Sequence, residues 1–382
     1  MTTSSDHLNF TSNGTTAQSV ASTNYLTLGS HICTTIMSII YAMGYIGNTF
    51  ALITFSSKRL RRISSSIFLL AIAISDIGAL LTSLWIFLSD AFGIPLQNYS
   101  ALACRFRTFF AYVFMDLSSW CIAGLAFDRY LRIRFPFGSK SLCTPRNAFF
   151  VVLTFVLVLC GINGHYFSPG IGQERGENRS TAHCLENRDT YPNYYYFYKR
   201  IWPKIDMIIF CFLPACIMIL CNANIIYLRK KQLDYVENTN SFRSKKETTQ
   251  INTQQTLNGI LSTRKVFTAH RRSMERQMSL MMAACVIVFI CTTVPVTICL
   301  ILLEEFTIKD PNRKQNNDFY LLIFRTLRAL MYVHFGSNFY LYCLTSRIFR
   351  AEFFQTITCQ KFPEIPSKDQ STNIALNKIS DV

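Results

Sequence analysis

Long apolar segments alternate with polar ones along the whole chain of 382 residues. Each apolar segment has around 20 residues or more, the length that a helix needs to cross the hydrocarbon core of a bilayer. The segments are continuously apolar rather than alternating, which favours helices over a β-barrel. The pattern therefore predicts an all-α membrane protein, a seven-transmembrane helix bundle. Its spans are expected near residues 30–55, 65–89, 103–127, 147–168, 204–228, 278–303 and 319–345.

The segments between and beside the spans divide the rest of the chain. The tail 1–27 is rich in Ser, Thr and Asn and has no basic region typical of a removable signal peptide, so we expect a disordered extracellular tail. Residues 28–345 are expected to form the helix bundle, and its loop at about 230–272 shows little periodicity and is interpreted as a mobile linker. Residues 346–357 alternate apolar and polar positions at helical spacing, which predicts an amphipathic helix on the inner membrane surface before a cytoplasmic tail, 358–382.

Composition and charge support a membrane protein and give its orientation. Half of the residues are hydrophobic and 16% are charged, whereas soluble domains carry about a quarter. With the N-terminus outside, the inner loops and tail hold 25 of the 38 Lys and Arg residues and nine acids, so the net charge of +16 lies on the inner side. This matches the positive-inside rule, and attraction to anionic inner lipids explains the basic balance better than binding to nucleic acid.

Glycosylation sequons agree with this orientation. Asn-x-Ser/Thr occurs at four positions, all on the side assigned to the outside: Asn9, Asn13, Asn98 and Asn178. The inner loops hold none, although they are rich in Asn, Ser and Thr. The protein is therefore expected to be a multi-pass plasma-membrane glycoprotein with an extracellular N-terminus.

Most of the 14 cysteines lie within apolar segments, where they act as small hydrophobic residues. Cys104 and Cys184 lie instead at the outer side. Cys359 follows the predicted surface helix and is a candidate for palmitoylation, the alternative being a free cytosolic thiol. No Cys/His spacing resembles a zinc site, and no catalytic nucleophile or phosphate loop is evident, so the chain is not expected to be an enzyme.

The third span ends in Asp128-Arg129-Tyr130, and Cys104 stands 25 residues before Arg129. That separation is roughly 37 Å of helix, enough to place one end in each aqueous phase. This segment resembles the third helix of rhodopsin-like G-protein-coupled receptors. The seventh span ends in Asn338-Phe-Tyr-Leu-Tyr342, which resembles the Asn-Pro-x-x-Tyr motif with Phe in place of Pro. Similar endings occur in invertebrate neuropeptide receptors for FMRFamide-type peptides.

The resemblance implies a bridge between Cys104 and Cys184 over the mouth of the bundle. It also implies a polar core that binds an allosteric sodium ion, made by Asn48, Asp76, Ser118 and Asn338. No other cofactor is expected. The alternative for the core is a protonated Asp76 satisfied by hydroxyls and amides. His334 departs from the family here, because a smaller polar residue is usual at its position.

The resemblance further implies a G-protein coupling switch at the inner end. Its members are Asp128, Arg129, Tyr130, Glu275 and Tyr342. Arg129 would pair with the neighbouring Asp128 and with Glu275 of the sixth span, forming a latch that opens on activation. The alternative is a surface ion pair worth no more than about 1 kcal/mol.

Two positions argue against particular classes of ligand. Ala111 replaces the aspartate of amine receptors, so a biogenic amine is not expected. Tyr332 replaces the retinal-linking lysine of opsins, so a light sensor of that type is not expected.

Two other positions depart from the family. The sixth span carries Thr293 where the family has its switch tryptophan, and the fifth has Asn222 where a tyrosine is usual. These departures affect the mechanism of activation more than the fold.

The outer mouth is rich in charges and aromatic residues, and it suits a peptide ligand. Its charged residues are Asp206, Glu304, Glu305, Arg325 and Arg328. The chain is thus predicted to be a cell-surface receptor that binds a neuropeptide and activates heterotrimeric G proteins, with arrestin and receptor kinase as further partners. The alternatives are a receptor of the same fold for a lipid or small acid, and a channel or transporter. The lack of an internal repeat weighs against a transporter.

Overall fold

The computed structural model describes residues 12–58, 60–173, 183–186, 188–246, 255–309 and 317–358. Within these ranges the chain is helical apart from loops and one antiparallel pair of short strands. The elements are α1 Ser12–Phe55, η1 Leu60–Arg62, α2 Ser64–Phe92, η2 Leu96–Asn98, α3 Ala101–Arg134, α4 Ser139–Leu142, α5 Pro145–Asn163, η3 Gly164–Phe167, β1 Ile171–Gln173, β2 His183–Glu186, α6 Pro192–Tyr196, η4 Phe197–Ile201, α7 Trp202–Asp206, η5 Met207–Phe212, α8 Leu213–Lys246, α9 Gln255–Lys309, α10 Asn317–Thr345 and α11 Arg347–Thr358.

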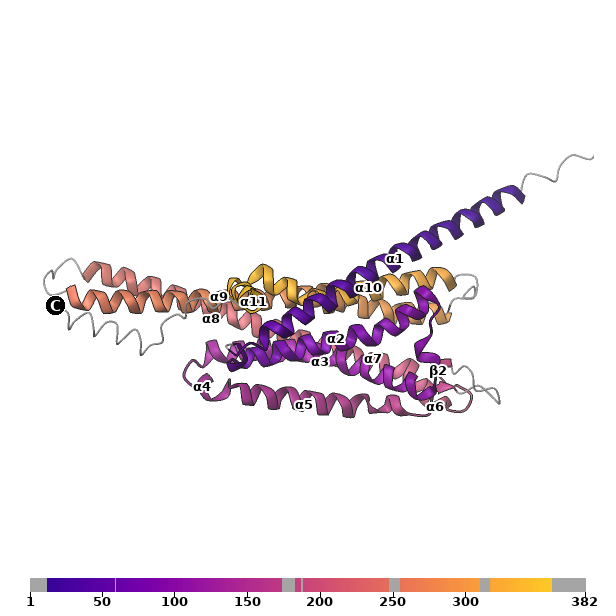
Figure 1. Cartoon of the computed structure of the whole chain (residues 1–382), viewed down its shortest axis with the longest axis horizontal. Coiled ribbons are helices and arrows are strands. Elements are labelled where there is room, and N and C mark those ends of the chain that lie inside the picture. Colours follow the sequence, from indigo (N-terminus) through magenta and orange to yellow (C-terminus); the bar gives the residue numbers. More distant parts are fainter. Residues whose placement is uncertain are drawn as a thin grey trace, which may run out of the picture.

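The long helices run side by side along one axis and form the predicted bundle (Figure 1). Six helical segments of the described chain are long and apolar enough to cross a membrane, and they include α1, α2, α3, α5 and the segment from α6 into α8. The seventh helix of the bundle is α10, which carries Arg325 and Arg328 and packs against α1 and α9. The prediction of an all-α, seven-helix membrane protein is confirmed.

The centre of the bundle is formed by α2 and α3. Two thirds of their apolar windows are buried inside the protein, compared with 17% for α5, which lies at the periphery. Close approach also fixes α1: a Cβ atom on Gly44 would lie 2.5 Å from Leu80 Cδ1 and 3.3 Å from Gly336 Cα. The absence of a side chain at Gly44 lets α1 approach both α2 and α10 closely.

Two prolines interrupt the regular helix of the fifth span. Pro203 and Pro214 lack the N–H that would bond to the carbonyl four residues earlier. In each case a π-helical segment precedes the proline, at η4 and at η5. Wider turns of this kind take up the register change while the helix continues through the membrane.

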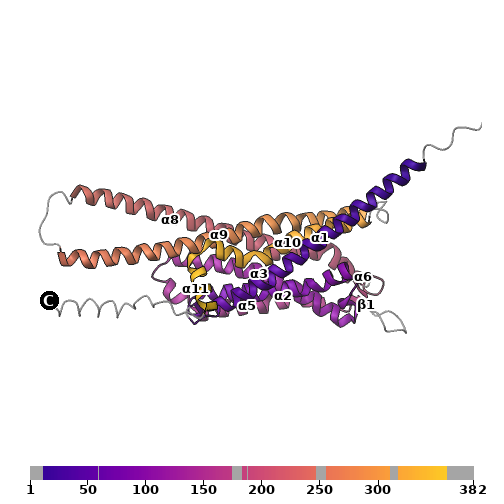
Figure 2. The same ribbon diagram turned by 45° about the horizontal axis from the view of Figure 1, so that its top comes forward.

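Three helices are longer than the apolar pattern predicted. α1 begins at Ser12, inside the tail that was expected to be disordered. α8 continues to Lys246 and α9 begins at Gln255, so much of the predicted linker 230–272 is helical, and the two helices project together beyond the bundle (Figure 2). The reason is that hydrophobic periodicity reports burial, whereas Lys, Arg, Gln and Glu form exposed helices without it. No Gly or Pro interrupts α8 after Pro214.

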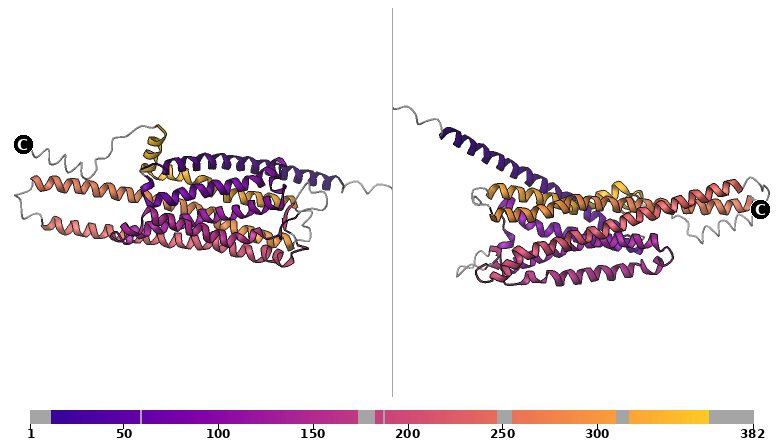
Figure 3. Two further views of the ribbon diagram at one scale, coloured as in Figure 1. Left: turned by 60° about the horizontal axis from the view of Figure 1, so that its bottom comes forward. Right: turned by 180° about the vertical axis from the view of Figure 1, so that it is seen from behind.

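α11 turns across the end of the bundle instead of continuing α10 (Figure 3). It falls where the sequence predicts the amphipathic surface helix. Two of its aromatic residues face the bundle, with Phe349 5.1 Å from Phe55 and Phe353 5.2 Å from Phe339 between ring centroids. Phe339, which replaces the proline of the family motif, thus helps to anchor α11.

Candidate functional site

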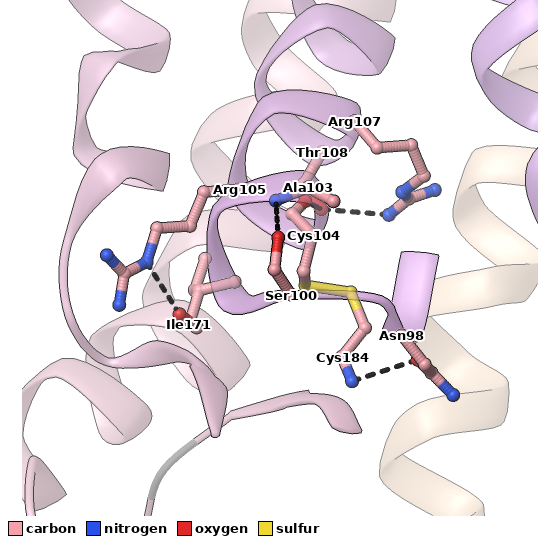
Figure 4. Close-up of a disulfide and its surroundings, with 9 residues drawn as sticks. All are labelled: Asn98, Ser100, Ala103, Cys104, Arg105, Arg107, Thr108, Ile171 and Cys184. Carbon is pink, nitrogen blue, oxygen red and sulfur yellow. Dashed lines mark hydrogen bonds between the residues drawn. A yellow bond between two sulfur atoms is a disulfide. The ribbon is translucent and has the colours of Figure 1, made fainter. Parts of the chain in front are cut away.

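The outer end of α3 is bonded to the loop before the fifth span. Cys104 and Cys184 form the expected disulfide, with their Cα atoms 5.4 Å apart (Figure 4). The backbone N–H of Cys184 also donates to the Asn98 side-chain oxygen at 3.1 Å. The disulfide and this hydrogen bond hold β2 over the mouth of the bundle.

The same end of α3 is also fixed to β1. The Ser100 hydroxyl caps the helix by accepting from the N–H of Ala103 at 3.0 Å, and Arg105 Nε donates to the carbonyl of Ile171 at 2.8 Å (Figure 4). Gly172 has φ +79°, and a Cβ there would lie 2.8 Å from the Cα of Ala101. Glycine is therefore required for the strand to lie this close to α3.

Two arginines at the outer end of α10 share one carboxylate. Arg328 Nη1 lies 3.6 Å from Asp90 Oδ2 on α2, and Arg325 Nε lies 3.9 Å from the same atom. Arg325 also donates to Ser30 at 2.7 Å, and the Arg328 guanidinium lies 4.4 Å from the centre of the Phe324 ring. Asp90, Arg325 and Arg328 border a cavity of about 30 Å³, enough for a water molecule. The pairs are long and partly exposed, so each is weak.

The other predicted mouth residues are arranged differently from the expectation. Glu305 pairs with Arg200 at 2.7 Å and not with an arginine of α10. The side chain of Glu304 lies outside the described residues. Asp206 lies deeper, at the end of α7. Arg107 of α3 adds a third arginine, whose Nε is buried without a partner in the described structure.

The predicted polar core is brought together in the middle of the bundle. The buried Asp76 carboxylate accepts from the Ser118 hydroxyl at 2.5 Å and from the Asn338 amide at 2.7 Å, which joins α2, α3 and α10. Asn48 donates at 2.9 Å to the carbonyl of Phe335, so α1 is tied to the same layer. All four predicted side chains are buried.

Most of the polar side chains in this core offer oxygen atoms that can bind a sodium ion, and one does not. Asp76 and Ser118 supply oxygens, and the second amide atom of Asn338, Oδ1, is buried without a partner in the described structure. His334 supplies an imidazole instead of an oxygen. Its ring is buried between Phe289 and Phe335, with centroids 5.0 and 5.1 Å away, and neither nitrogen has a partner among the described residues. Asp76, Ser118 and Asn338 would hold the ion.

At the inner end, Asp128 joins α3 to the start of α2. Its carboxylate accepts from Ser64 Oγ at 2.6 Å, Ser65 Oγ at 2.9 Å and Arg132 Nε at 3.1 Å. Arg132 joins the predicted partner Arg129 here, because residues four apart lie on one face of a helix. Arg129 also interacts electrostatically with Asp128.

Arg132 extends this cluster to the loop after α3. Its Nη2 donates to Ser64 Oγ at 2.6 Å and to the carbonyl of Cys143 at 2.9 Å. The Cys143 thiol lies 3.7 Å from the carbonyl of Asp128. Burial, reinforced by the Asp128 charge, raises the pKa of this thiol to about 11, so it remains a neutral donor. We call Ser64, Ser65, Asp128 and Arg132 the inner polar cluster.

The remaining switch residues are only partly described. Arg129 and Tyr130 lie on the last turns of α3. The backbone of Glu275 lies on α9, but its side chain is outside the described residues, so the predicted latch stays a prediction. Tyr342 is buried, with its ring 5.7 Å from Phe55.

The predicted modification sites are mostly outside the described part of the chain. Asn9, Asn178 and Cys359 are not described, and nor is the side chain of Asn13. Asn98 lies at the outer side, on η2. Its Oδ1 is the acceptor for Cys184 N–H, which leaves the amide nitrogen for a glycan.

Three polar residues of the bundle were not predicted. Asp90 was missed because it lies more than 230 residues from its arginine partners. Asp116 and Asn163 form a buried hydrogen bond of 2.8 Å between α3 and α5. The signal for Asp116 was present: it is an ionisable residue within the third apolar segment, the property that marked Asp76.

Comparisons with known proteins agree with this geometry. Residues 47–342 match the family described as 7 transmembrane receptor (rhodopsin family). The probable G-protein coupled receptor B0563.6 of Caenorhabditis elegans is 24% identical over 88% of this chain and 71% of its own length. The galanin-like G-protein coupled receptor npr-9 of C. elegans is 29% identical over 34% of this chain, and human galanin receptor type 2 is 28% identical over 30%. Each of these two matches covers 29% of the relative.

Proposed function

Because this chain belongs to the rhodopsin family of seven-transmembrane receptors, we propose that it binds an extracellular peptide and activates heterotrimeric G proteins. The family is a receptor family and is not enzymatic, so the chemistry of the site is recognition and conformational change. We further propose the plasma membrane as its location, with the N-terminus outside. The disulfide at the outer end of α3 supports this orientation, since disulfides form in oxidising compartments.

The charge of the outer mouth carries the proposal of a peptide ligand. Among the described residues, Arg325 and Arg328 share one carboxylate, Asp90, which leaves this group with one positive charge in excess. An acidic side chain or terminus of a peptide would compensate that excess charge, in addition to Asp90. The names of two similar proteins, a galanin-like receptor and a galanin receptor, favour the same ligand class.

The inner end supports the proposal of G-protein coupling. Asp128 is bonded to Ser64, Ser65 and Arg132, so it restrains the end of α3 against α2. Arg129 lies beside Asp128 on the last turns of α3, and Glu275 lies on α9 of the sixth span. We propose that separation of α3 from α9 at this level opens the inner end to a G protein, and later to receptor kinase and arrestin.

A receptor of the same fold for a lipid or small acid is the second candidate. The excess positive charge at Arg325 and Arg328 would also suit a carboxylate of that kind. A channel or transporter fits less well, because Asp76 and Asp116 form discrete buried hydrogen bonds between neighbouring helices rather than a polar path. The membrane-facing helices are apolar and leave many large hydrophobic side chains exposed.

A screen of amidated neuropeptides against the expressed receptor tests the proposal. Binding of a GTP analogue to the membranes should rise with one or a few related peptides. Fatty acids and small carboxylic acids, added in the same assay, test the second candidate. Ligand-independent ion flux without any rise in GTP-analogue binding would overturn the receptor mechanism.

A further inference from the structure

A group of acidic residues lies deeper in the bundle than the arginines of the mouth. Asp116, near the middle of α3, is 1% exposed. Its Oδ2 accepts from the Asn163 amide at 2.8 Å, and its Oδ1 has no partner in the described structure. The amide of Asn163 also donates to the carbonyl of Leu159 at 3.1 Å, while its own Oδ1 is fully buried and unpartnered. Two buried acceptor oxygens are therefore left open beside each other.

Asp206 of the fifth span lies at the same depth. One span separates α3 from the fifth span, so the two run through the membrane in the same direction. They are joined by a hydrogen bond of 3.2 Å from Trp120 Nε1 to the carbonyl of Ile209. Trp120 is one turn after Asp116 and Ile209 is nearly one turn after Asp206, so the two acids occupy one layer. Their carboxylates interact electrostatically.

No cation compensates these acids within the described structure. The ion pairs there involve Asp90, Asp128 and Glu305, and neither Asp116 nor Asp206 takes part in one. Two carboxylates in one layer of an apolar bundle repel each other and are poorly solvated. The arrangement is stable only if a proton or a cation lies between them.

The surroundings suit a cation with an organic substituent. Tyr112, one turn above Asp116, stacks on Tyr166 with ring centroids 4.6 Å apart, and it interacts electrostatically with Asp206. Trp202 holds Tyr166 in place through a hydrogen bond of 2.6 Å. Aromatic faces attract guanidinium and ammonium groups. Asp206 is partly exposed, whereas Asp116 is closed off, so a cation would reach Asp206 first.

We propose that Asp116, Asp206 and Asn163 Oδ1 form a subsite for one guanidinium or ammonium group of the ligand. A ligand with a basic group placed below an acidic one would then match both the subsite and the arginines of the mouth. The identity of that ligand as a peptide rests on the proposed function. The subsite itself does not.

Fragments of matched shape test the subsite without a peptide. The thermal midpoint of the purified full-length chain in detergent is measured against n-butylguanidinium chloride and against neutral n-butylurea, with NaCl added to equal ionic strength. We expect stabilisation by n-butylguanidinium alone, and at least a tenfold weaker apparent affinity in Asp116→Asn. Asp206→Asn should show the same loss and replaces Asp116→Asn if that variant does not fold. Asp318→Asn, which neutralises an exposed acid at the start of α10, should bind like the unmodified chain.

Three results would overturn the subsite. These are no stabilisation by n-butylguanidinium, equal stabilisation by n-butylurea or by NaCl alone, and unchanged affinity in both Asp116→Asn and Asp206→Asn. In each case the acids share a proton or bind an inorganic ion. If no peptide activates the receptor, the fragment assay still tests the subsite. If the fragment does not bind, the proposal that the chain is a peptide receptor still stands. If an active peptide is found, replacing its Arg by citrulline should reduce potency in the unmodified receptor and not in Asp116→Asn.

Discussion

The inner polar cluster predicts different stabilities for two adjacent serine variants. Ser64 and Ser65 are both 1% exposed, both stand in the first turn of α2, and both donate to the carboxylate of Asp128. The two alanine variants differ in the hydrogen-bond donors that remain for the Asp128 carboxylate. Asp128 Oδ1 receives only the Ser64 hydroxyl among the described residues, whereas Oδ2 receives both Ser65 and Arg132. Ser64→Ala therefore removes the sole donor to one oxygen of a buried carboxylate.

The size of each effect follows from these contacts. A hydrogen bond to a charged acceptor contributes about 1.5–3 kcal/mol. Ser64→Ala also removes an acceptor from Arg132, but this guanidinium is 31% exposed and regains water, so that part is below about 1 kcal/mol. We expect Ser64→Ala to lower the free energy of unfolding by about 2–3 kcal/mol. Ser65→Ala should lower it by about 1 kcal/mol, because Arg132 Nε remains on Oδ2 at 3.1 Å.

Equilibrium unfolding of the purified receptor in detergent, followed by loss of helical circular dichroism, measures both values. The two variants remove the same atom from neighbouring buried positions, so each controls for the other. Equal losses, or a larger loss for Ser65→Ala, would refute the view that Ser64 is the main link between α2 and Asp128.

Three further predictions concern the outer mouth and the core. Ala at Cys104 or Cys184 should reduce surface expression to a similar extent, since losing a native disulfide costs about 2–5 kcal/mol, and normal cell-surface staining of either variant would contradict this. Asp76→Ala should lower the thermal midpoint of the purified chain by several degrees, because the buried Ser118 hydroxyl and Asn338 amide lose their acceptor. An unchanged midpoint would argue against the polar core as a link between these helices. Arg328→Ala should weaken an acidic agonist by roughly thirtyfold, whereas Asp90→Asn should strengthen it or leave it unchanged; dose–response curves decide, and a loss for Asp90→Asn equal to that for Arg328→Ala would mean that their pair is only structural.

The sequence was sufficient where the physical signal is local. Apolar segments of spanning length predicted the bundle, because a bilayer requires them wherever the chain crosses it. Asp76 was identified because an ionisable group in an apolar helix is costly and needs partners. The resemblance to the family then supplied Ser118 and Asn338, and the structure places both against its carboxylate.

The sequence was insufficient where contacts join distant segments or depend on helix faces. Nothing local connects Asp90 with Arg325, which stand 235 residues apart. The contact of Asp128 with Arg132 was missed because Arg132 stands one turn further on, on the same face of α3. Helix ends in water were also missed, since polar helices lack the apolar pattern used to find the spans.

The central claim is that the inner end of α3 switches a G protein through Arg129. Its most direct test is the basal rate of nucleotide exchange on purified heterotrimeric G proteins, measured with the receptor reconstituted in vesicles without ligand. Equal amounts of the unmodified chain, Glu275→Ala and Arg129→Ala are compared with receptor-free vesicles. We predict the fastest exchange with Glu275→Ala, slower exchange with the unmodified chain, and the receptor-free rate with Arg129→Ala. Equal exchange by the unmodified chain and Arg129→Ala, or no increase for Glu275→Ala, would contradict the account.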